Sequence, residues 1–345
     1  MNLAKEKRIL FLIVSAVLLL AVMLTLTLGV ALSMRDARAV TDDLYDADVG
    51  AEERRNILLF GRDRVSGLSD VMMLVSLDGT CGELNVLQIP RDTYAEYTAT
   101  GYRKINGVLS ALGADGACEF LSDAFGVNID GYVAFDLDAF SDVVDMIGGV
   151  EIDIPFDMEY RDSYQDLYIS IPAGRQTLDG ERAEQFVRYR FGYVRGDLGR
   201  IDAQKLFMSA LFRKISEDVG RFELLRIATS LWDKIDTNIA LSDAISLAAS
   251  VLSFDSEHVN MLTLSGEDVR SSVSGAWFYV ISKSAAYEQL TTYMGADVDA
   301  ECFDRGGAFL NEASAEFERI YSSYLPYSVS SVGELNKNGI DIEKR

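Results

Sequence analysis

The chain has 345 residues and a formal net charge of -22, because 54 acidic side chains outnumber 32 basic ones. This acidic balance excludes a nucleic-acid partner, which would require a basic face. The single histidine, His258, excludes a multi-histidine metal site and a histidine-based triad, and three cysteines without paired or metal-type spacing exclude a disulfide framework. Any catalysis must therefore use carboxylates, arginines, lysines or a bound metal ion.

An apolar run over residues 9–34 follows three basic residues near the N-terminus. It has about 25 residues, enough for a helix to cross a bilayer core of about 30 Å. The basic flank predicts a cytoplasmic N-terminus over residues 1–8, with everything after the helix outside the cell membrane. A cleaved signal peptide is the alternative, since residues 37–39 have the small-x-small form. We favour a single uncleaved span, because the apolar run is longer than the core of such a peptide.

Composition divides the rest of the chain into three segments. Residues 35–53 are polar and acidic, which is typical of a linker. Residues 54–294 carry the strand and helix patterns of a folded domain. Residues 295–345 are acidic and rich in serine, with a helical pattern near 313–324 and a polar end from Glu334. We expect this last segment to be a small appendage or a partly ordered tail.

The folded domain is predicted to begin with three strands, at 56–60, 71–77 and 84–89, because each is a short continuous apolar run. Such runs are typical of strands covered on both faces. The pattern then predicts two helices within 105–125, separated near Gly113, and a helix over 138–147 with Asp138 as its N-cap. The other predicted elements are strands at 132–137, 150–154, 169–171, 259–264 and 277–281, and helices at 181–189, 197–216, 221–235, 241–252 and 284–294. This alternation predicts an α/β fold with a central mixed sheet between helices.

Two carboxylates lie at the ends of the first two strands. Asp63 follows the first strand, and Asp70 directly precedes the second. If the strands are neighbours, the two side chains can hold a hard cation such as Mg²⁺. The alternative is a pair of loop aspartates that cap turns.

The third strand ends at Pro90, and Arg91 and Asp92 follow it. Ligands of open sheets bind at the carboxyl ends of strands, so these residues are candidates for a site at the sheet rim. The alternative is an ordinary surface ion pair between the two side chains.

Lys104 and Asn106 stand at a predicted helix start. There they could contact an anion near the positive end of the helix dipole. An ordinary solvated N-terminus is the alternative.

Four arginines occur between positions 188 and 200, against the acidic balance of the chain. Arg188 and Arg190 end one predicted helix, whereas Arg200 and Gln204 share a face of the next. Asp197 begins that second helix, as a cap or as an arginine partner. Apolar neighbours draw this stretch toward a core, where arginine usually has an anionic partner such as a carboxylate or a phosphate. Structural salt bridges at the core edge are the alternative.

Taken together, cationic side chains around two metal-binding carboxylates suit a diphosphate, whose charge they neutralise as it is cleaved. With its motifs in this order, the chain closely resembles the LytR–CpsA–Psr family. The resemblance covers about residues 54–293 and rests on the motifs NILLFGRD, SDVMML, IPRDTY, YRKING, YVAFDLDAFSDVVDMIGGVEIDIP, IPAGRQTLDGERAEQFVRYR and GDLGRIDAQKLF.

The resemblance implies a membrane-anchored extracytoplasmic phosphotransferase that moves a glycopolymer from a polyprenyl-diphosphate carrier to peptidoglycan. The polymer would be a teichoic acid, a capsule or another wall polysaccharide. It also implies a central sheet between helices, with a long apolar pocket for the prenyl chain. A carboxylate, Asp63 or Asp92, would accept the proton of the attacking hydroxyl.

Position by position, the resemblance also assigns site residues. Those that it implies bind Mg²⁺ are Asp63 and Asp70; those that it places at the diphosphate are Arg91, Arg188, Arg190 and Arg200. Gln204 matches the glutamine of the same motif, Lys104 and Asn106 match the lysine-isoleucine-asparagine motif, and Asp92 matches the aspartate after the first of those arginines. Two positions depart from the family pattern, because Leu68 and Val71 stand where arginine and threonine are usual. Arg62 or Arg64 could supply the missing cation; without it, metal affinity or rate would be lower.

Two other functions use the same residues. One is a non-catalytic scaffold of wall assembly that binds the lipid diphosphate or the polymer without turnover. The other is a polyprenyl-diphosphate hydrolase with water as the acceptor. Release of polyprenyl phosphate, with and without a glycan acceptor, separates these functions from the transferase.

Overall fold

The computed structural model describes residues 54–63, 67–97, 103–163, 167–251, 254–272, 274–297, 303, 309, 317–319, 329–340, 342 and 344. The predicted membrane span and the linker lie outside the described residues. Within the described part of the chain, no helix is long and apolar enough to cross a membrane. From residue 54 onward, the described residues form one compact unit.

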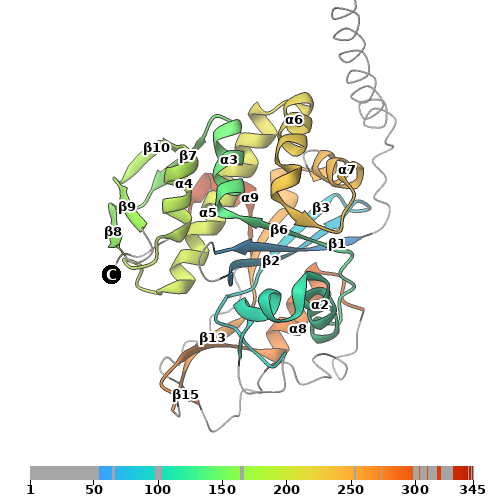
Figure 1. Ribbon diagram of the computed structural model, residues 1–345, viewed down its shortest axis with the longest axis vertical. Helices are drawn as coiled ribbons and strands as arrows, with labels where there is room; N and C mark the ends of the chain where they lie inside the picture. The colour runs from blue at the N-terminus through green and yellow to red at the C-terminus, as the bar shows by residue number, and fades with distance from the viewer. Residues whose placement is uncertain are drawn as a thin grey trace, which may run out of the picture. The chain divides into compact units, whose positions relative to one another are not determined.

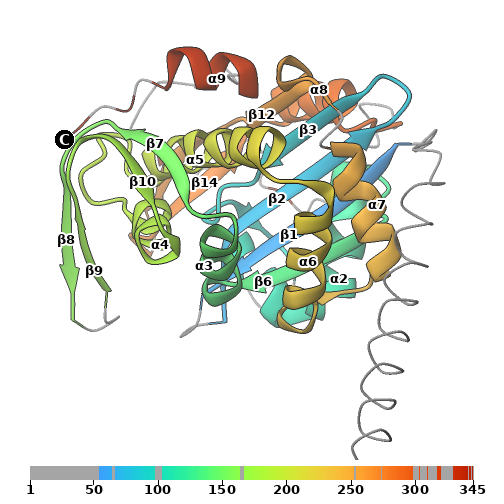
Figure 2. The same cartoon turned by 90° about the horizontal axis from the view of Figure 1, so that it is seen from above.

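A seven-stranded mixed sheet forms the centre of this unit (Figures 1 and 2), in the order β11-β6-β1-β2-β3-β12-β16. β1 pairs antiparallel with β2 and β2 antiparallel with β3, whereas β6 and β12 add in parallel on either side. The bounds are β1 Arg55–Arg62, β2 Ser69–Asp78, β3 Glu83–Gln88, β6 Gly131–Asp136, β11 Asp236–Thr237, β12 Val259–Thr263 and β16 Ser330–Ser331. The three predicted apolar strands therefore occupy the middle of the sheet.

Helices cover both faces of this sheet, as the apolar residues on both sides of its strands require. On one face, α2 (Val108–Phe125) and α8 (Lys283–Tyr293) pack against buried side chains such as Leu58 and Leu74. On the other face, α5 (Asp197–Asp218), α7 (Leu241–Val251) and α9 (Val332–Asn338) pack over Val86 and Met261. The predicted fold, a central mixed sheet between helices, is confirmed.

A second apolar core lies beside the sheet, where two two-stranded sheets, β7–β10 and β8–β9, meet α3 and α4 (Figure 2). Phe186 of α4 and Phe207 of α5 are fully buried there, with ring centroids 6.2 Å apart. The elements are α3 Leu137–Met146, β7 Val150–Ile154, β8 Met158–Asp162, β9 Leu167–Ile171, β10 Gly174–Leu178, α4 Gly180–Arg188 and α6 Arg221–Leu231. This core fixes α4 against α5, the two helices that carry the arginine-rich stretch.

Another hairpin, β13 (Gly266–Ser271) and β14 (Trp277–Ile281), lies against the loop that follows β3. The Tyr279 N–H donates to the carbonyl of Asp92 at 2.8 Å, which ties the hairpin to that loop. β15 (Phe317–Arg319) pairs with β13, and the short strands β4 (Tyr94–Ala95) and β5 (Arg103–Lys104) pair with each other. Three 3₁₀ turns complete the described elements, at Ile105–Gly107, Trp232–Lys234 and Ser256–His258.

Most predicted elements are confirmed to within a few residues, including the break in α2 at Gly113, where φ is 73°. The N-cap of α3 is not Asp138, as predicted, but Asp136, whose carboxylate accepts from the Ala139 N–H at 2.9 Å. The predicted helix near 313–324 is wrong at 317–319, which form β15. The polar end contains α9, which begins with a capping box between Ser331 and Glu334.

Candidate functional site

Two arginines and two aspartates from three separate parts of the chain form a connected ion cluster at one edge of the sheet. Arg91, in the loop after β3, places Nη1 2.6 Å from Oδ1 of Asp70 on β2. Its Nε lies 3.4 Å from Oδ1 of Asp197, and Nη2 of Arg200 lies 3.0 Å from the same oxygen. Arg200 also donates to the Asp70 carbonyl at 3.4 Å. The structure thus joins four of the predicted site residues directly.

The start of α5 builds one half of this cluster. Gly196 precedes the helix with φ 58°, a conformation that suits glycine. Asp197 is then the first helical residue, where a negative charge is favoured by the helix dipole. Arg200 follows three residues later on the same face, with only 4% of its surface exposed. Asp197 is therefore an arginine partner and not the N-cap.

The cluster brings positive charges close together in a buried setting. Burial lowers the pKa of Arg91, but the charges of Asp197 and Asp70 outweigh it and leave that pKa raised. Burial also lowers the pKa of Arg200, and there the nearby Arg91 adds to the effect. Both Nε atoms are shielded from solvent and make no hydrogen bond within the described structure. Buried donors that make no hydrogen bond are expected where an anion binds.

A second cationic group stands next to the first. Nζ of Lys104 lies 2.7 Å from Oδ1 of Asp92 and 5.7 Å from the centroid of the Phe278 ring. Asn106 is held nearby because its N–H donates to the Arg91 carbonyl at 3.2 Å. The structure therefore brings Lys104, Asn106 and Asp92 to the same rim as Arg91. Lys104 is the N-cap of the 3₁₀ turn Ile105–Gly107, which leads directly into α2, so the predicted helix start is confirmed.

The α4–α5 junction is held by Gln204, which is buried. Its amide donates to the Val187 carbonyl at 3.0 Å and accepts from the side chain of Gln88 at the end of β3. This linkage fixes the end of α4, where Arg188 pairs with Glu184 at 2.9 Å. Gln204 thus has a positioning role in the structure.

Arg190 is exposed beyond the helix end, although its charge still acts on Arg200.

An apolar pocket opens beside the ion cluster. Asp63, Asp70, Arg188 and Arg200 are among its lining residues, so both predicted metal ligands face one space. Its apolar walls come from the central strands and from α3, α4 and α5, and consist of Leu59, Val71, Met73, Phe135, Leu137, Phe140, Val187, Phe207 and Met208. The cavity has a volume of about 100 Å³. The long pocket that the resemblance implied stays a prediction.

Asp63 and Asp70 suit a magnesium ion that also binds substrate. Mg²⁺ usually takes one or two protein carboxylates and completes its shell with waters and substrate phosphates. The described residues contain no group of three or more metal-binding side chains. The pair therefore fits a metal that is shared with a phosphate and does not fit an all-protein metal cage.

The two departures from the family motif occupy different surroundings. Val71 lines the apolar pocket, where a hydroxyl would be usual, and Leu68 lies close to Gly107. Arg62 also lines the pocket and lies 3.7 Å from Asp236, a loose and exposed ion pair. Arg62 therefore has access to the site as a replacement cation, whereas Arg64 lies outside the described residues.

Two carboxylates at the site were missed by sequence reasoning. Asp136 ends β6 and lines the pocket, and the rule that ligands bind at the carboxyl ends of strands could have identified it. Asp268 lies on β13, which was not predicted at all. Burial, followed by the charges of Asp197 and Asp92, raises the pKa of Asp268 to about 6. No local motif around Asp268 marks it in the sequence.

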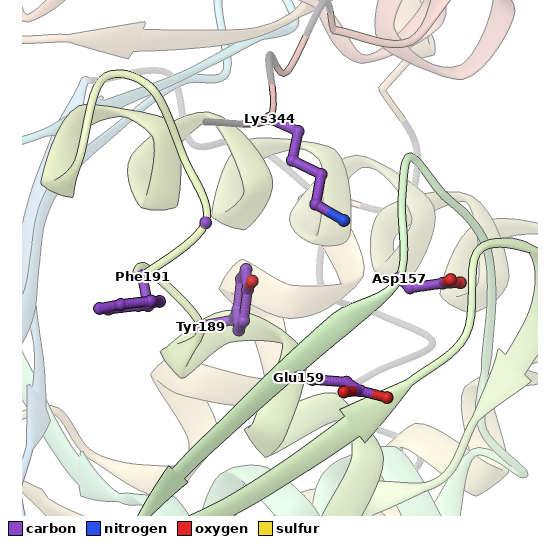
Figure 3. Close-up of a pocket in the computed structure, with 6 residues that line it drawn as sticks. Asp157, Glu159, Tyr189, Phe191 and Lys344 are labelled. Carbon is purple, nitrogen blue, oxygen red and sulfur yellow. The ribbon is translucent and has the colours of Figure 1, made fainter.

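The loop that follows Arg188 borders a second, more open pocket (Figure 3), with a volume of about 640 Å³. Tyr189 and Phe191 of this loop lie on one side of it and Asp157 and Glu159 on the other, and Lys344 extends into the space between Tyr189 and Asp157. Phe191 is 67% exposed and packs on Tyr160, with ring centroids 5.6 Å apart. The loop therefore has the arginine site on one side and an aromatic, acidic surface pocket on the other.

Comparison with known proteins supports the relationship that the motifs suggested. The chain is 31% identical over 217 residues to the polyisoprenyl-teichoic acid–peptidoglycan teichoic acid transferase TagV of Bacillus subtilis (strain 168), covering 62% of this chain and 56% of that protein. It is 26% identical over 290 residues to the TagU transferase of Oceanobacillus iheyensis, covering 77% of this chain and 88% of that protein. The chain thus spans little more than half the length of the first relative.

The fold agrees with these sequence matches. The crystal structure of Bacillus subtilis TagV superposes with a TM-score of 0.60 at 28% identity, covering 73% of this chain and 98% of that one. The model of the LytR_cpsA_psr family matches residues 30–294, most of the chain. The chain belongs to the LytR_cpsA_psr family.

Proposed function

We propose that this protein transfers a glycopolymer from a polyprenyl-diphosphate carrier to peptidoglycan. One observation carries the proposal: the arginine cluster, in which the buried Nε atoms of Arg91 and Arg200 make no hydrogen bond within the described structure, adjoins an apolar pocket that Arg200 lines. A prenyl diphosphate has this same division, with a charged head and an apolar tail. Relatives whose names describe polyisoprenyl-teichoic acid–peptidoglycan transfer support the choice of donor and acceptor.

The pocket and the cluster order the substrate. The first part of the prenyl chain enters between α3 and α5, and the rest requires the walls to move apart, because the cavity is only about 100 Å³. Met73 and Met208 are flexible enough to allow this movement. The lipid-linked phosphate then lies near Arg188 and Arg200, and the glycan-linked phosphate extends toward Arg91 and Lys104.

The reaction is a phosphoryl transfer between two oxygens. A sugar hydroxyl of peptidoglycan attacks the phosphorus that carries the glycan, a new P–O bond forms, and the bond to the bridging oxygen breaks. That bond's electron pair leaves with polyprenyl phosphate. Arginines held in place before the reaction neutralise the charge that develops on the leaving phosphate, which is worth more in a buried site than in water.

Magnesium fits this proposal through Asp63 and Asp70, which would hold it against the phosphates. When bound, the ion would neutralise phosphate charge in the same way as the arginines. We expect chelation by EDTA to abolish transfer and added Mg²⁺ to restore it. Asp63→Asn should weaken Mg²⁺ binding in calorimetry with an unreactive prenyl diphosphate analogue present, whereas Asp153→Asn, an exposed change on β7, should not. Full transfer with EDTA present would contradict the metal role.

The same proposal includes the cell membrane. The apolar run at 9–34 would anchor the N-terminus and leave the domain on the outer side, where both the lipid carrier and peptidoglycan are accessible. An uncleaved chain that fractionates with membranes and whose domain is accessible to protease from outside is the expected result. Recovery of a shortened chain from the medium would favour the cleaved signal peptide.

The decisive experiment compares products with and without an acceptor. Full-length protein in detergent is incubated with Mg²⁺, a polyprenyl-diphosphate-linked oligosaccharide and peptidoglycan fragments, and polyprenyl phosphate and glycan-modified peptidoglycan are measured. A transferase releases both together and only with the acceptor present. Release without acceptor would indicate a hydrolase, and tight binding without release would indicate a scaffold.

A further inference from the structure

Asp268 lies on β13, in the hairpin that packs on the loop after β3. It pairs with Tyr279 across the hairpin, and the Tyr279 N–H donates to the Asp92 carbonyl at 2.8 Å. Gly266 lets the two strands approach, because a Cβ there would lie 2.3 Å from the Val280 carbonyl oxygen. The position of Asp268 relative to the site is therefore fixed by backbone contacts.

The carboxylates around the cluster are not equivalent. Asp92 is paired with Lys104, and Asp197 is shared by Arg91 and Arg200. Within the described structure, no hydrogen bond or ion pair engages the partly buried Asp268 carboxylate. The charged groups that act on it are Asp197 of α5, Asp92 and Lys104 at the rim, and Arg195 of the α4–α5 loop. Asp268 is thus the carboxylate in this group that is available to take up a proton.

The apolar pocket defines which end of the diphosphate faces Asp268. Asp70, Arg188 and Arg200 line that pocket, but Arg91, Asp92, Lys104 and Asp268 do not. A diphosphate with its lipid tail in the pocket therefore presents its glycan-linked phosphate to the residues outside the pocket, Arg91, Asp92, Lys104 and Asp268. The attacking hydroxyl must approach that glycan-linked phosphorus from the side away from the bridging oxygen, which is the side away from the pocket.

We propose that Asp268 accepts the proton of the acceptor hydroxyl, which deepens the proposed transferase function and rests on it. The hydroxyl oxygen forms its bond to phosphorus, its proton moves to a carboxylate oxygen of Asp268, and polyprenyl phosphate leaves with the electron pair. Asp63 is less suited to this role because it lines the pocket that would hold the lipid tail. Asp92 is less suited because its Oδ1 is already paired with Lys104.

The raised pKa of Asp268, about 6, supports this assignment because a base works best when its pKa is near the working pH. Only the ionised form accepts a proton, so the rate should rise with pH through about 6 and level off above it. Stability should change in the opposite direction: a raised carboxyl pKa favours the protonated form in the folded state, so stability falls as pH rises from about 4 to 6.

The test measures kcat and KM against pH for wild type, Asp268→Asn and the neighbouring control Glu267→Gln, in the full-length protein. We expect Asp268→Asn to lower kcat about 10²–10⁴-fold with little change in KM for the lipid carrier, and to remove the rise near pH 6. Glu267→Gln should keep both the rate and the profile. Binding of an unreactive prenyl diphosphate analogue should be unchanged in all three.

Each outcome of this test is informative. If wild type transfers glycan and Asp268→Asn keeps the same kcat and pH profile, the role of Asp268 is wrong while the transferase function stands. A fall in both kcat and analogue binding would show that Asp268 only shapes the site. If wild type gives no transfer at all, the proposed function itself fails.

Discussion

Arg91→Ala is expected to lower glycopolymer transfer about 10²–10³-fold, the usual loss when one fixed donor to a developing negative charge is removed. Arg91 joins Asp70 to Asp197 through two different nitrogens and faces the glycan-linked phosphate of the proposed complex. Its loss removes a positive charge from the transition state and leaves two carboxylates facing the substrate. Release of polyprenyl phosphate from the lipid carrier under single-turnover conditions measures the effect.

Two further variants isolate the cause. Arg91→Lys keeps the charge but offers one nitrogen in place of a planar fork, so it should recover only part of the rate. Arg175→Ala removes an exposed arginine that pairs with Glu151 at 2.6 Å, and should leave both stability and activity nearly unchanged. Full activity in Arg91→Ala, with wild-type dependence on lipid concentration, would remove Arg91 from the site.

Much of the fold was predictable because its strongest signals are local. The strands β1, β2 and β3 are continuous apolar runs, and burial on both faces explains why. Short strands with alternating exposure, such as β8 and β10, were missed because half of their residues are polar. The break at Gly113 was predictable from a glycine inside a helical pattern, and the structure places it at positive φ.

The candidate site was predictable where its residues end strands or begin helices. Arg91 follows β3 and Arg200 lies in the first turn of α5, and the structure brings both to Asp70 and Asp197. Pairing partners were not predictable, because ions that are over 100 residues apart meet only through the fold. Asp268 shows the same limit: its environment depends on how a hairpin packs, which no spacing in the sequence encodes.

The shared partner Asp197 explains why the two arginines differ in their expected effect on stability. Arg91 is partly exposed, so water can take its place beside Asp70 and Asp197 when its side chain is removed. Arg200 is almost fully buried, and its guanidinium lies between Asp197 and the backbone carbonyl of Asp70. A charge buried in this way is retained only because its partner is charged as well, so removal of one side leaves the other uncompensated.

Arg200→Met is therefore expected to lower the free energy of unfolding by about 3 kcal/mol, because Asp197 then keeps Arg91 alone as a partner at 3.4 Å. Equilibrium unfolding in urea, at equal m-values, measures this loss. Adding Asp197→Asn should restore part of it, because the uncompensated carboxylate is removed, and the double-mutant cycle gives the coupling between the two side chains. Additive losses would show that Arg200 acts through packing alone. Transfer should be abolished both in Arg200→Met and in the double variant with Asp197→Asn. Restoring stability does not restore the lost positive charge at the lipid-linked phosphate.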